Sequence, residues 1–333
     1  MTDVVASQSA APILRVENLR VTFDTADGPA PAVRGVSFGV ARGEALAIVG
    51  ESGSGKSVTM LALLGLLNGA HVSGSARFRD TELLGLDAAA LREVRGAKVA
   101  MIFQDPMTSL NPVLTIGQQL SLVMRAHQPN LSRKLALARA VELLDQVSIS
   151  QPKRRCASYP HELSGGMRQR VLIAMAISNE PEVLIADEPT TALDVTVQAQ
   201  IMDLLGELRR EHHLALVLIT HDLGVVAGTT DRIAVMYAGR LVESGDVGPL
   251  FSSPGHPYTR GLLECLPRLD ARREVKASIM GVPPSPHSLP PGCAFTPRCS
   301  YALPSCSEVE PELALRGATM TACPVVVING VAT

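Results

Sequence analysis

The chain has 333 residues, a length typical of about two domains at ~150 residues each, and it can bury a sizeable core. Its 30 basic and 32 acidic residues give a net charge of −2, which excludes a strongly basic nucleic-acid binder and an acidic tail. The contents of 46% hydrophobic and 19% charged residues exclude global disorder. Aromatic residues make up only 3%, which argues against a stacking platform for bases or sugars.

The N-terminal region carries no targeting signal that we recognise. Residues 1–12 are rich in Ala and Ser, and we expect them to form a disordered tail. They lack the basic region and apolar core of a secretory signal, and no apolar run in the chain reaches the ~20 residues that a membrane helix needs. We therefore expect a cytosolic chain whose six cysteines are thiols or metal ligands rather than disulfides.

Apolar runs and helical patterns alternate along most of the chain. The spacing predicts strands at residues 14–16, 21–23, 33–40, 45–49, 98–103, 183–186 and 214–219. The last two runs are continuously apolar, which is typical of parallel strands buried on both faces. Residues 115–147 favour helix with Ser132 as a cap, and a helical stripe capped by Asp194 follows residue 186. This alternation predicts an α/β fold with a parallel sheet.

The composition changes near residue 268. Six prolines fall between Pro283 and Pro297, cysteines cluster in the same stretch, and regular elements are hard to find there. We therefore expect a main domain at residues 13–267 and a small irregular module at residues 268–333.

A glycine-rich segment follows the predicted strand 45–49. It reads Gly50-Glu51-Ser52-Gly53-Ser54-Gly55-Lys56-Ser57, followed by Val58, and it matches G-x-x-x-x-G-K-S between a strand and a helix. Glycines let backbone N–H groups face a phosphate, and the following helix presents its positive end to the same anion. Lys56 is expected to neutralise the β- and γ-phosphates, and the Ser57 hydroxyl to ligate Mg²⁺.

Two carboxylates end a later apolar run. Asp187 and Glu188 follow the predicted strand 183–186, at the carboxyl edge of the sheet where such folds bind ligands. Adjacent carboxylates can divide their roles, with Asp187 on the metal and Glu188 polarising the attacking water. Alone, Glu188 would more often be a solvated loop charge, but a phosphate loop in the same chain favours the catalytic interpretation.

Residues 163–170 read LSGGMRQR and resemble the signature motif of the ABC ATPases. A Ser-Gly-Gly at a helix start is itself an anion site, because its open N–H groups and the helix dipole point outward. The resemblance implies that this segment caps the γ-phosphate of ATP held by an opposite subunit, through Ser164, Gly165, Gly166 and Gln169.

Further motifs occur in the order typical of that family, and the resemblance implies their roles. Phe23 would stack on adenine, Gln104 would sense Mg²⁺ and couple to the membrane partner, Asp194 would cross the dimer interface, and His221 would contact the γ-phosphate. The implied fold is a P-loop NTPase of ABC type. It has a RecA-like parallel core, an antiparallel β subdomain and a helical subdomain at about residues 105–163. The implied cofactors are ATP and Mg²⁺, with Ser57, Gln104 and Asp187 at the metal.

Segments 50–58, 101–112 and 256–259 resemble the peptide-importer branch, in its D type. The resemblance implies an ATPase that powers dipeptide or oligopeptide import from the cytoplasmic face of a bacterial inner membrane, as a peripheral subunit. Its implied partners are a second, nonidentical F-type ATPase, two permease subunits and, indirectly, a peptide-binding protein, with no nucleic acid.

Other functions stay open to different degrees. Nickel and glutathione importers share much of this pattern, so it indicates the class of transporter but leaves these solutes as alternatives to peptides. A soluble ABC ATPase acting on nucleic acid or ribosomes is disfavoured, because the chain has one cassette and only 59 residues between Gln104 and Ser164. A regulatory subunit that binds ATP without turnover is disfavoured because Glu188 and His221 are intact. A role in export is disfavoured because the C-terminal module resembles that of peptide importers.

Four cysteines near the C-terminus have the spacing C-x5-C-x6-C-x16-C. They are Cys293, Cys299, Cys306 and Cys323. Four thiolates suit an iron–sulfur cluster or tetrahedral zinc, and packing as small apolar thiols is a third alternative. The segment 292–299 resembles the C-terminal extension of peptide-importer ATPases, where such cysteines can hold a [4Fe-4S] cluster. Cys156 and Cys265 are expected to be buried thiols.

Overall fold

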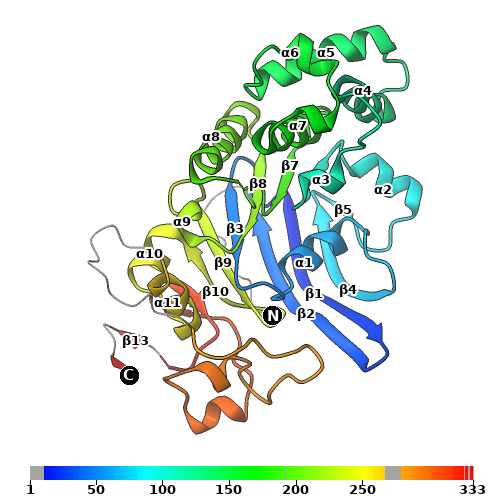
Figure 1. Ribbon diagram of the computed structural model, residues 1–333. Coiled ribbons are helices and arrows are strands. Elements are labelled where there is room, and N and C mark those ends of the chain that lie inside the picture. Colours follow the sequence, from blue (N-terminus) through cyan, green and yellow to red (C-terminus); the bar gives the residue numbers. More distant parts are fainter. Residues whose placement is uncertain (1–10, 192, 267–278, 326, 329–330, 333) are drawn as a thin grey trace. The chain divides into compact units, whose positions relative to one another are not determined.

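The computed structural model describes residues 11–191, 193–266, 279–325, 327–328 and 331–332 (Figure 1). Most of the expected N-terminal tail and the predicted boundary at 267–268 lie outside the described residues. By their internal contacts the residues form two compact units. The first comprises Met1–Gly39, Ala45–Gly85 and Thr220–Thr333, and the second comprises Val40–Glu44 and Leu86–Ile219. Within the described part, every helix is too short or too polar to span a membrane.

The first unit contains a four-stranded sheet in the order β2-β1-β4-β5. Its strands are β1 (Leu14–Thr25), β2 (Gly28–Val40), β4 (Ala70–Phe78) and β5 (Thr81–Glu82), and β4 runs antiparallel to both β1 and β5. The two runs predicted at 14–16 and 21–23 belong to one strand. A register irregularity between Glu17 and Arg20 shifts the alternation of buried residues, which makes one strand read as two. The antiparallel sheet agrees with the predicted β subdomain.

A second set of strands in this unit has the order β11-β12-β10-β9-β3. The strands are β3 (Ala45–Val49), β9 (Arg232–Tyr237), β10 (Arg240–Asp246), β11 (Ala314–Arg316) and β12 (Thr319–Thr321). β3 and β9 pair in parallel, and the other pairs are antiparallel. The expected C-terminal module therefore includes two strands that extend a sheet. A short pair, β13 (Val327–Ile328) and β14 (Val331–Ala332), lies farther along the chain.

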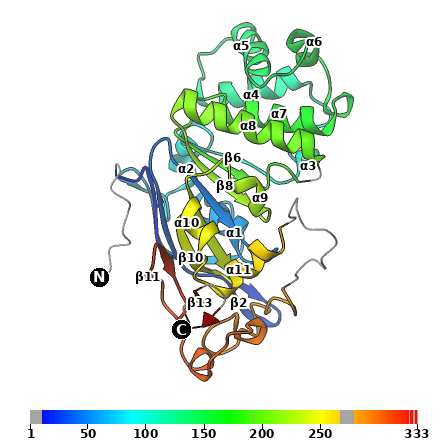
Figure 2. The ribbon, with the colours of Figure 1, turned by 90° about the vertical axis from the view of Figure 1, so that its left-hand side faces the viewer.

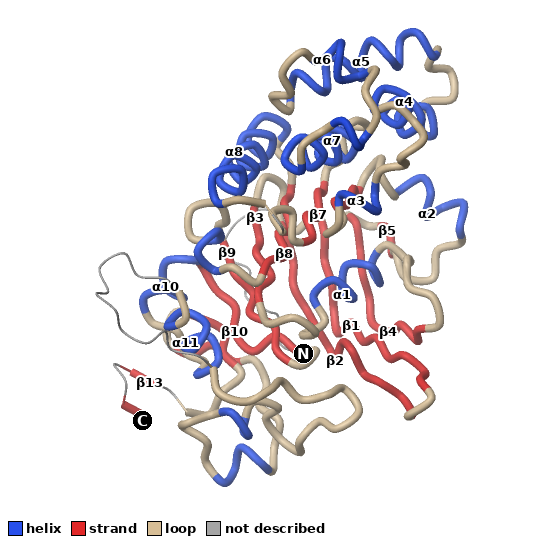
Figure 3. The backbone as a smooth tube through the Cα atoms, in the orientation of Figure 1, coloured by secondary structure: helices blue, strands red, loops and turns tan. Residues whose placement is uncertain are grey.

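The helices of the first unit are short. They are α1 (Lys56–Leu63), α9 (Leu223–Val226), α10 (Val247–Ser252) and α11 (Pro257–Glu264). Beyond α11 the described residues are mostly loop (Figure 3), with 3₁₀ turns at η2 (Thr296–Arg298) and η3 (Pro304–Ser307). An aromatic cluster of Tyr237, Tyr258 and Phe295 links β9, α11 and this loop region, with ring centroids 4.6–5.4 Å apart. Burial of three aromatic rings supplies much of the apolar contact that the irregular segment otherwise lacks.

The second unit has three parallel strands in the order β8-β7-β6. They are β6 (Val99–Ile102), β7 (Val183–Asp187) and β8 (Ala215–Thr220). Every residue of β7 and β8 is buried, as the continuous apolar runs predict. Together with the parallel β3 and β9, they confirm the predicted α/β class.

Helices make up the rest of the second unit (Figure 2). They are α2 (Ala88–Val94), α3 (Pro106–Ser109), α4 (Ile116–His127), α5 (Arg133–Gln146), α6 (Pro152–Cys156), η1 (Pro160–Glu162), α7 (Gly165–Ile177) and α8 (Val195–His212). The stretch 115–147 holds two helices rather than one, because Ser132 caps the second by accepting from the Leu135 N–H. Asp194 caps α8 in the same way, as expected.

Candidate nucleotide-binding site

The glycine-rich segment forms a tight loop between β3 and α1. β3 is buried along its whole length, and α1 begins directly after Gly55. Gly55 has a φ of 102°, and a Cβ there would lie 2.5 Å from the Ala32 carbonyl oxygen. Only glycine fits this position, which explains the residue type that the motif requires.

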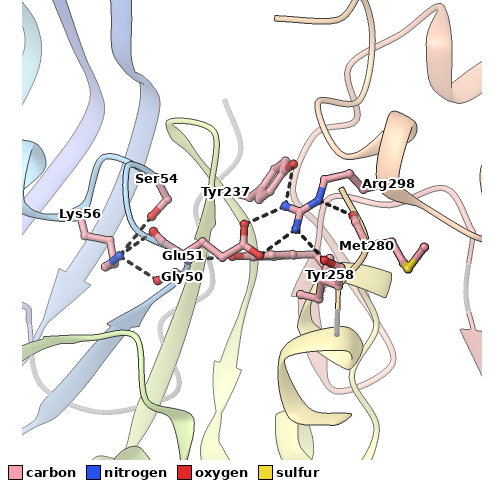
Figure 4. A network of polar contacts seen from close by, with 9 residues as sticks. Gly50, Glu51, Ser54, Lys56, Tyr237, Tyr258, Met280 and Arg298 are labelled. Carbon is pink, nitrogen blue, oxygen red and sulfur yellow. Dashed lines mark hydrogen bonds and ion pairs between the residues drawn. The ribbon is translucent and has the colours of Figure 1, made fainter. Parts of the chain in front are cut away.

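Lys56 lies across the loop that it follows (Figure 4). Its Nζ donates to the Gly50 carbonyl at 2.8 Å and to the Glu51 carbonyl at 2.9 Å, and it lies 3.4 Å from Ser54 Oγ. The side chain is 5% exposed. The first turn of α1 has no side-chain cap. The loop thus combines a buried ammonium group with the N-terminus of a helix, an arrangement that attracts a phosphate.

The other loop residues predicted to touch nucleotide lie nearer the solvent. Ser52 and Gly53 are exposed, and Ser57 and Val58 are half-buried. Phe23 is half-buried on β1, opposite Ala70 of β4. Their contacts with nucleotide stay predictions.

In the second unit, the predicted catalytic residues Gln104 and Glu188 meet beside the end of β7. Asp187 is the last residue of β7 and is 4% exposed. Glu188 follows with a φ of 45°, a left-handed conformation that is uncommon for a non-glycine residue. Its N–H donates to the Ile219 carbonyl at 2.9 Å, and its carboxylate accepts from Gln104 Nε2 and from Thr191 Oγ1, each at 2.9 Å. Strained backbone of this kind persists where surrounding contacts fix it, and it clusters at functional sites.

The predicted signature residues lie at the start of α7. Ser164 is exposed and caps the helix by accepting from the Met167 N–H at 3.3 Å. Gly165 is also exposed, and a Cβ on Gly166 would lie 2.6 Å from Val197 Cγ1 in α8. Gln169 is 1% exposed, and its Nε2 has no hydrogen-bond partner among the described residues. The role of Gln169 at a partner's nucleotide stays a prediction.

The remaining predicted site residues follow strands or begin helices. Asp194 is exposed at the N-cap of α8. His221 is exposed directly after β8. The phosphate loop, Phe23 and His221 belong to the first unit, whereas Gln104, Asp187, Glu188, the signature residues and Asp194 belong to the second.

The sequence analysis missed the residues that hold Glu51. Arg298 of η2 forms a bidentate ion pair with the Glu51 carboxylate, at 2.7 and 3.0 Å (Figure 4). Tyr258 of α11 accepts a hydrogen bond from the Glu51 N–H at 2.8 Å. Segments 256–259 and 292–299 contain these two residues, and their sequence indicates only a family resemblance. Their contacts with the phosphate loop join residues more than 200 positions apart, and local sequence patterns do not predict such contacts.

A buried polar group orients Tyr258. Glu243 is fully buried and accepts from the N–H groups of Gly255 and His256, at 2.7 and 3.0 Å. His256 caps α11 through its Nδ1, which accepts from the Tyr258 N–H at 3.0 Å. Burial lowers the pKa of His256 to about 3, so the ring is neutral and carries its proton on Nε2. Burial also raises the pKa of Tyr258, so its hydroxyl stays protonated.

The four C-terminal cysteines do not form a metal site in the described structure. Cys306 and Cys323 are buried, and Cys293 and Cys299 are half-buried. Burial raises the pKa of the Cys299 thiol and raises that of Cys323 to about 11, which favours the protonated form of these two thiols at neutral pH. Among the described residues, no three His, Cys, Asp or Glu side chains gather as metal ligands. The described packing therefore supports neither the [4Fe-4S] cluster nor zinc.

The two isolated cysteines differ from each other. Cys156 is buried, as expected, and burial raises its pKa. Cys265 is only half-buried, so the expectation of a buried thiol was wrong there. It is the C-cap of α11, directly after the last helical residue.

Comparisons with known proteins agree with this geometry. A model of the ABC transporter family matches residues 33–191, and one of the oligopeptide/dipeptide transporter C-terminal region matches residues 242–306. The chain is 51% identical to the oligopeptide transport ATP-binding protein OppD of Escherichia coli, over 96% of this chain and 95% of that one. It is 53% identical to OppD of Haemophilus influenzae, over 91% and 93% of the two chains.

Solved structures show the same fold. A dimeric, post-hydrolysis ATP-binding cassette bound to ADP and Pi, MJ0796, matches with a TM-score of 0.63 and 31% identity, over 70% of this chain and 98% of that one. The identity to curated relatives extends over nearly the whole chain, including the part beyond the cassette. The chain therefore belongs to the ABC transporter family, among the oligopeptide transport ATP-binding proteins.

Proposed function

We propose that this chain is the ATP-hydrolysing subunit that powers oligopeptide or dipeptide import through an ABC permease. The observation that carries the proposal is the setting of Glu188. Its carboxylate directly follows a buried strand-end aspartate and is held by Gln104 and Thr191. A carboxylate in this place would accept a proton from the water that attacks the γ-phosphate. The family membership supports the same activity.

ATP would bind through the phosphate loop, residues 50–58, with Phe23 against the adenine. Lys56 would exchange its bonds to loop carbonyls for bonds to the β- and γ-phosphates, because an ammonium group binds an anion more strongly than a neutral carbonyl. Ser57, Asp187 and Gln104 are oxygen donors of the kind that Mg²⁺ prefers, and they would hold it. When bound, Mg²⁺ supplies positive charge to the phosphate oxygens. His221 would contact the γ-phosphate.

A complete catalytic site would need a second ATPase subunit, which we propose to be a nonidentical F-type homologue. Ser164, Gly165, Gly166 and Gln169 would then cap the γ-phosphate held by the partner, and Asp194 would lie at the interface. The exposed Ser164 at the start of α7 supports this role, because helix N–H groups there favour an anion. Binding of ATP would close the dimer and hydrolysis would release it, which is a ligand-biased two-state change.

The other partners would be two permease subunits and, indirectly, a peptide-binding protein, with the chain peripheral on the cytoplasmic face of the bacterial inner membrane. The helical subdomain near residues 105–163 would contact the permease. The names of the relatives, which specify oligopeptide transport, support peptides over nickel or glutathione as the imported solute.

The test is Glu188→Gln in the full chain, assembled with its transporter. We expect retained ATP binding, a turnover about 10²- to 10⁴-fold lower, and loss of labelled-peptide uptake. Glu207→Gln, a change of an exposed glutamate on α8, is the matched control and should keep wild-type turnover. Wild-type turnover by Glu188→Gln would refute the catalytic role of Glu188. Uptake of nickel or glutathione without uptake of peptide would refute peptides as the imported solute.

A further inference from the structure

The C-terminal segment reaches the phosphate loop through a single arginine. Arg298 donates to both oxygens of Glu51, from Nη1 to Oε2 at 2.7 Å and from Nη2 to Oε1 at 3.0 Å. The Arg298 side chain is 5% exposed and that of Glu51 is 26% exposed. The pair is therefore a bidentate contact largely shielded from water, unlike a surface ion pair.

The guanidinium group of Arg298 is fixed from several sides. Its Nε donates to the Met280 carbonyl at 2.9 Å, its Nη2 to the Ile279 carbonyl at 3.3 Å, and its Nη1 to the Tyr237 hydroxyl at 3.3 Å. It also lies 5.8 Å from the ring centroid of Tyr237 and 5.9 Å from that of Phe295. A guanidinium held in this way positions its partner, because neither side chain has to be ordered when nucleotide arrives.

Glu51 is an unfavourable residue beside a phosphate site unless its charge is compensated. It is the second residue of the phosphate loop, and its carbonyl oxygen accepts from Lys56 Nζ. Its side chain extends away from Lys56 toward Arg298 (Figure 4). A free carboxylate there would repel the polyphosphate and compete for Lys56. Arg298 offsets this charge and holds it on the side opposite to the lysine.

The backbone of Glu51 is held as well. Its N–H donates to the Tyr258 hydroxyl, whose ring is fully buried in the aromatic cluster. The loop is therefore fixed at Glu51 by two side chains from outside the loop, one on α11 and one on η2. Both side chains contact the phosphate loop at Glu51, so we expect them to act on nucleotide through that residue.

We propose that Arg298 is a positioning residue for the ATP site: it neutralises and withdraws the Glu51 carboxylate, so that the C-terminal segment sets the affinity of the phosphate loop for ATP. This inference rests on the proposed ATP binding. Its central requirement is that Arg298 acts on ATP through the Glu51 charge. A purely structural role in holding the C-terminal segment would not depend on that charge.

The experiment compares Arg298→Gln with the double variant Arg298→Gln/Glu51→Gln in the full chain, by titration with MgATP and by thermal unfolding without nucleotide. We expect Arg298→Gln to weaken ATP binding about tenfold. The double variant should recover most of this affinity, because the uncompensated carboxylate is gone. The double variant should not recover the thermal stability that Arg298→Gln loses. Arg260→Gln, which removes a more exposed Arg–Glu pair on α11, is the control and should bind ATP as the wild type does.

The outcomes separate this inference from the proposed function. Absence of MgATP binding by the wild type would refute the proposed function itself. Wild-type affinity in Arg298→Gln, or equal weakness in the single and double variants, would overturn the role of Arg298 while leaving ATP binding intact. If Arg298→Gln fails to fold, Arg298→Met takes its place in both variants, because it also removes the positive charge but keeps a long side chain against the rings of Tyr237 and Phe295. Rescue by Glu51→Gln is then the same criterion.

Discussion

Gln104 and Glu188 lie 84 positions apart in the chain and meet in a 2.9 Å hydrogen bond from Nε2 to Oε2. The strand β6 ends two residues before Gln104, and its parallel neighbour β7 ends one residue before Glu188. Parallel pairing brings both strand ends to the same edge, so the two side chains converge there. The contact ties the residue predicted to sense the metal to the residue predicted to activate water.

Removing the Gln104 amide should lower turnover without abolishing it. In Gln104→Ala, Glu188 keeps its bond to Thr191 but loses the amide donor of Gln104, so its carboxylate is less well oriented. We expect kcat to fall about tenfold, because one hydrogen bond to a charged group is worth about 1.5–3 kcal/mol. Steady-state ATPase kinetics would check this, with Gln146→Ala, which removes an exposed glutamine contact, as control. An unchanged kcat would show that Gln104 does not orient Glu188.

Lys56→Ala should weaken nucleotide binding itself. The variant removes the buried ammonium group that the phosphate loop surrounds. The affinity for MgATP should fall about 10- to 100-fold, which corresponds to lost charge-assisted hydrogen bonds. Equilibrium titration measures this, and Lys153→Ala, on the exposed face of α6, should leave the affinity unchanged. Equal affinities for Lys56→Ala and the wild type would contradict the phosphate-loop assignment.

Gly166→Ala should strain the contact between α7 and α8. The added Cβ would lie 2.6 Å from Val197 Cγ1, closer than real contacts allow. Overpacking of this kind costs about 1–3 kcal/mol, and we expect that loss in the free energy of unfolding. The second change Val197→Ala should recover part of the loss by removing the clashing methyl group. Gly206→Ala on α8, whose added Cβ would meet only Arg210 Nη1 at an ordinary contact distance of 4.0 Å, should instead be neutral or stabilising. Denaturant titration of the wild type and the three variants decides whether the clash is real.

His256 should make stability depend on pH in acid. Its folded pKa is about 3 and its ordinary value is 6.5, so between these values the unfolded chain binds a proton that the folded chain excludes. The free energy of unfolding should therefore fall by up to about 1.4 kcal/mol for each pH unit below 6.5, until about pH 3. Above pH 6.5 this group contributes no pH dependence.

The variant His256→Asn isolates that contribution. Asparagine is a good N-cap and can accept from the Tyr258 N–H, but it does not titrate. Its unfolding free energy, measured from pH 7 to 4, should fall less steeply than that of the wild type. Thr115→Asn, which replaces the non-titrating N-cap of α4, should keep the wild-type slope. Parallel curves for wild type and His256→Asn would show that the buried ring is not responsible.

Several features follow from local sequence because their physical causes are local. β7 and β8 are apolar over their whole length, which only burial on both faces favours. Ser132 and Asp194 cap helices because a short polar side chain can reach a free N–H three residues ahead. Gly55 adopts a conformation that other residues avoid, so the phosphate loop is readable from its glycines.

Tertiary structure alone decided which distant residues meet. The contact of Arg298 with Glu51 spans 247 positions, and that of Tyr258 with Glu51 spans 207. No periodicity reports such pairs, because they depend on the path of the whole chain and on the aromatic cluster that fixes it. The spacing of the four cysteines leaves an iron–sulfur cluster, zinc and packed thiols open, and the described packing supports neither metal. The sequence alone determined the class of chemistry, because the motifs that carry it are short. The fold decided which side chains orient the catalytic and binding residues, because those contacts form only when the chain is folded.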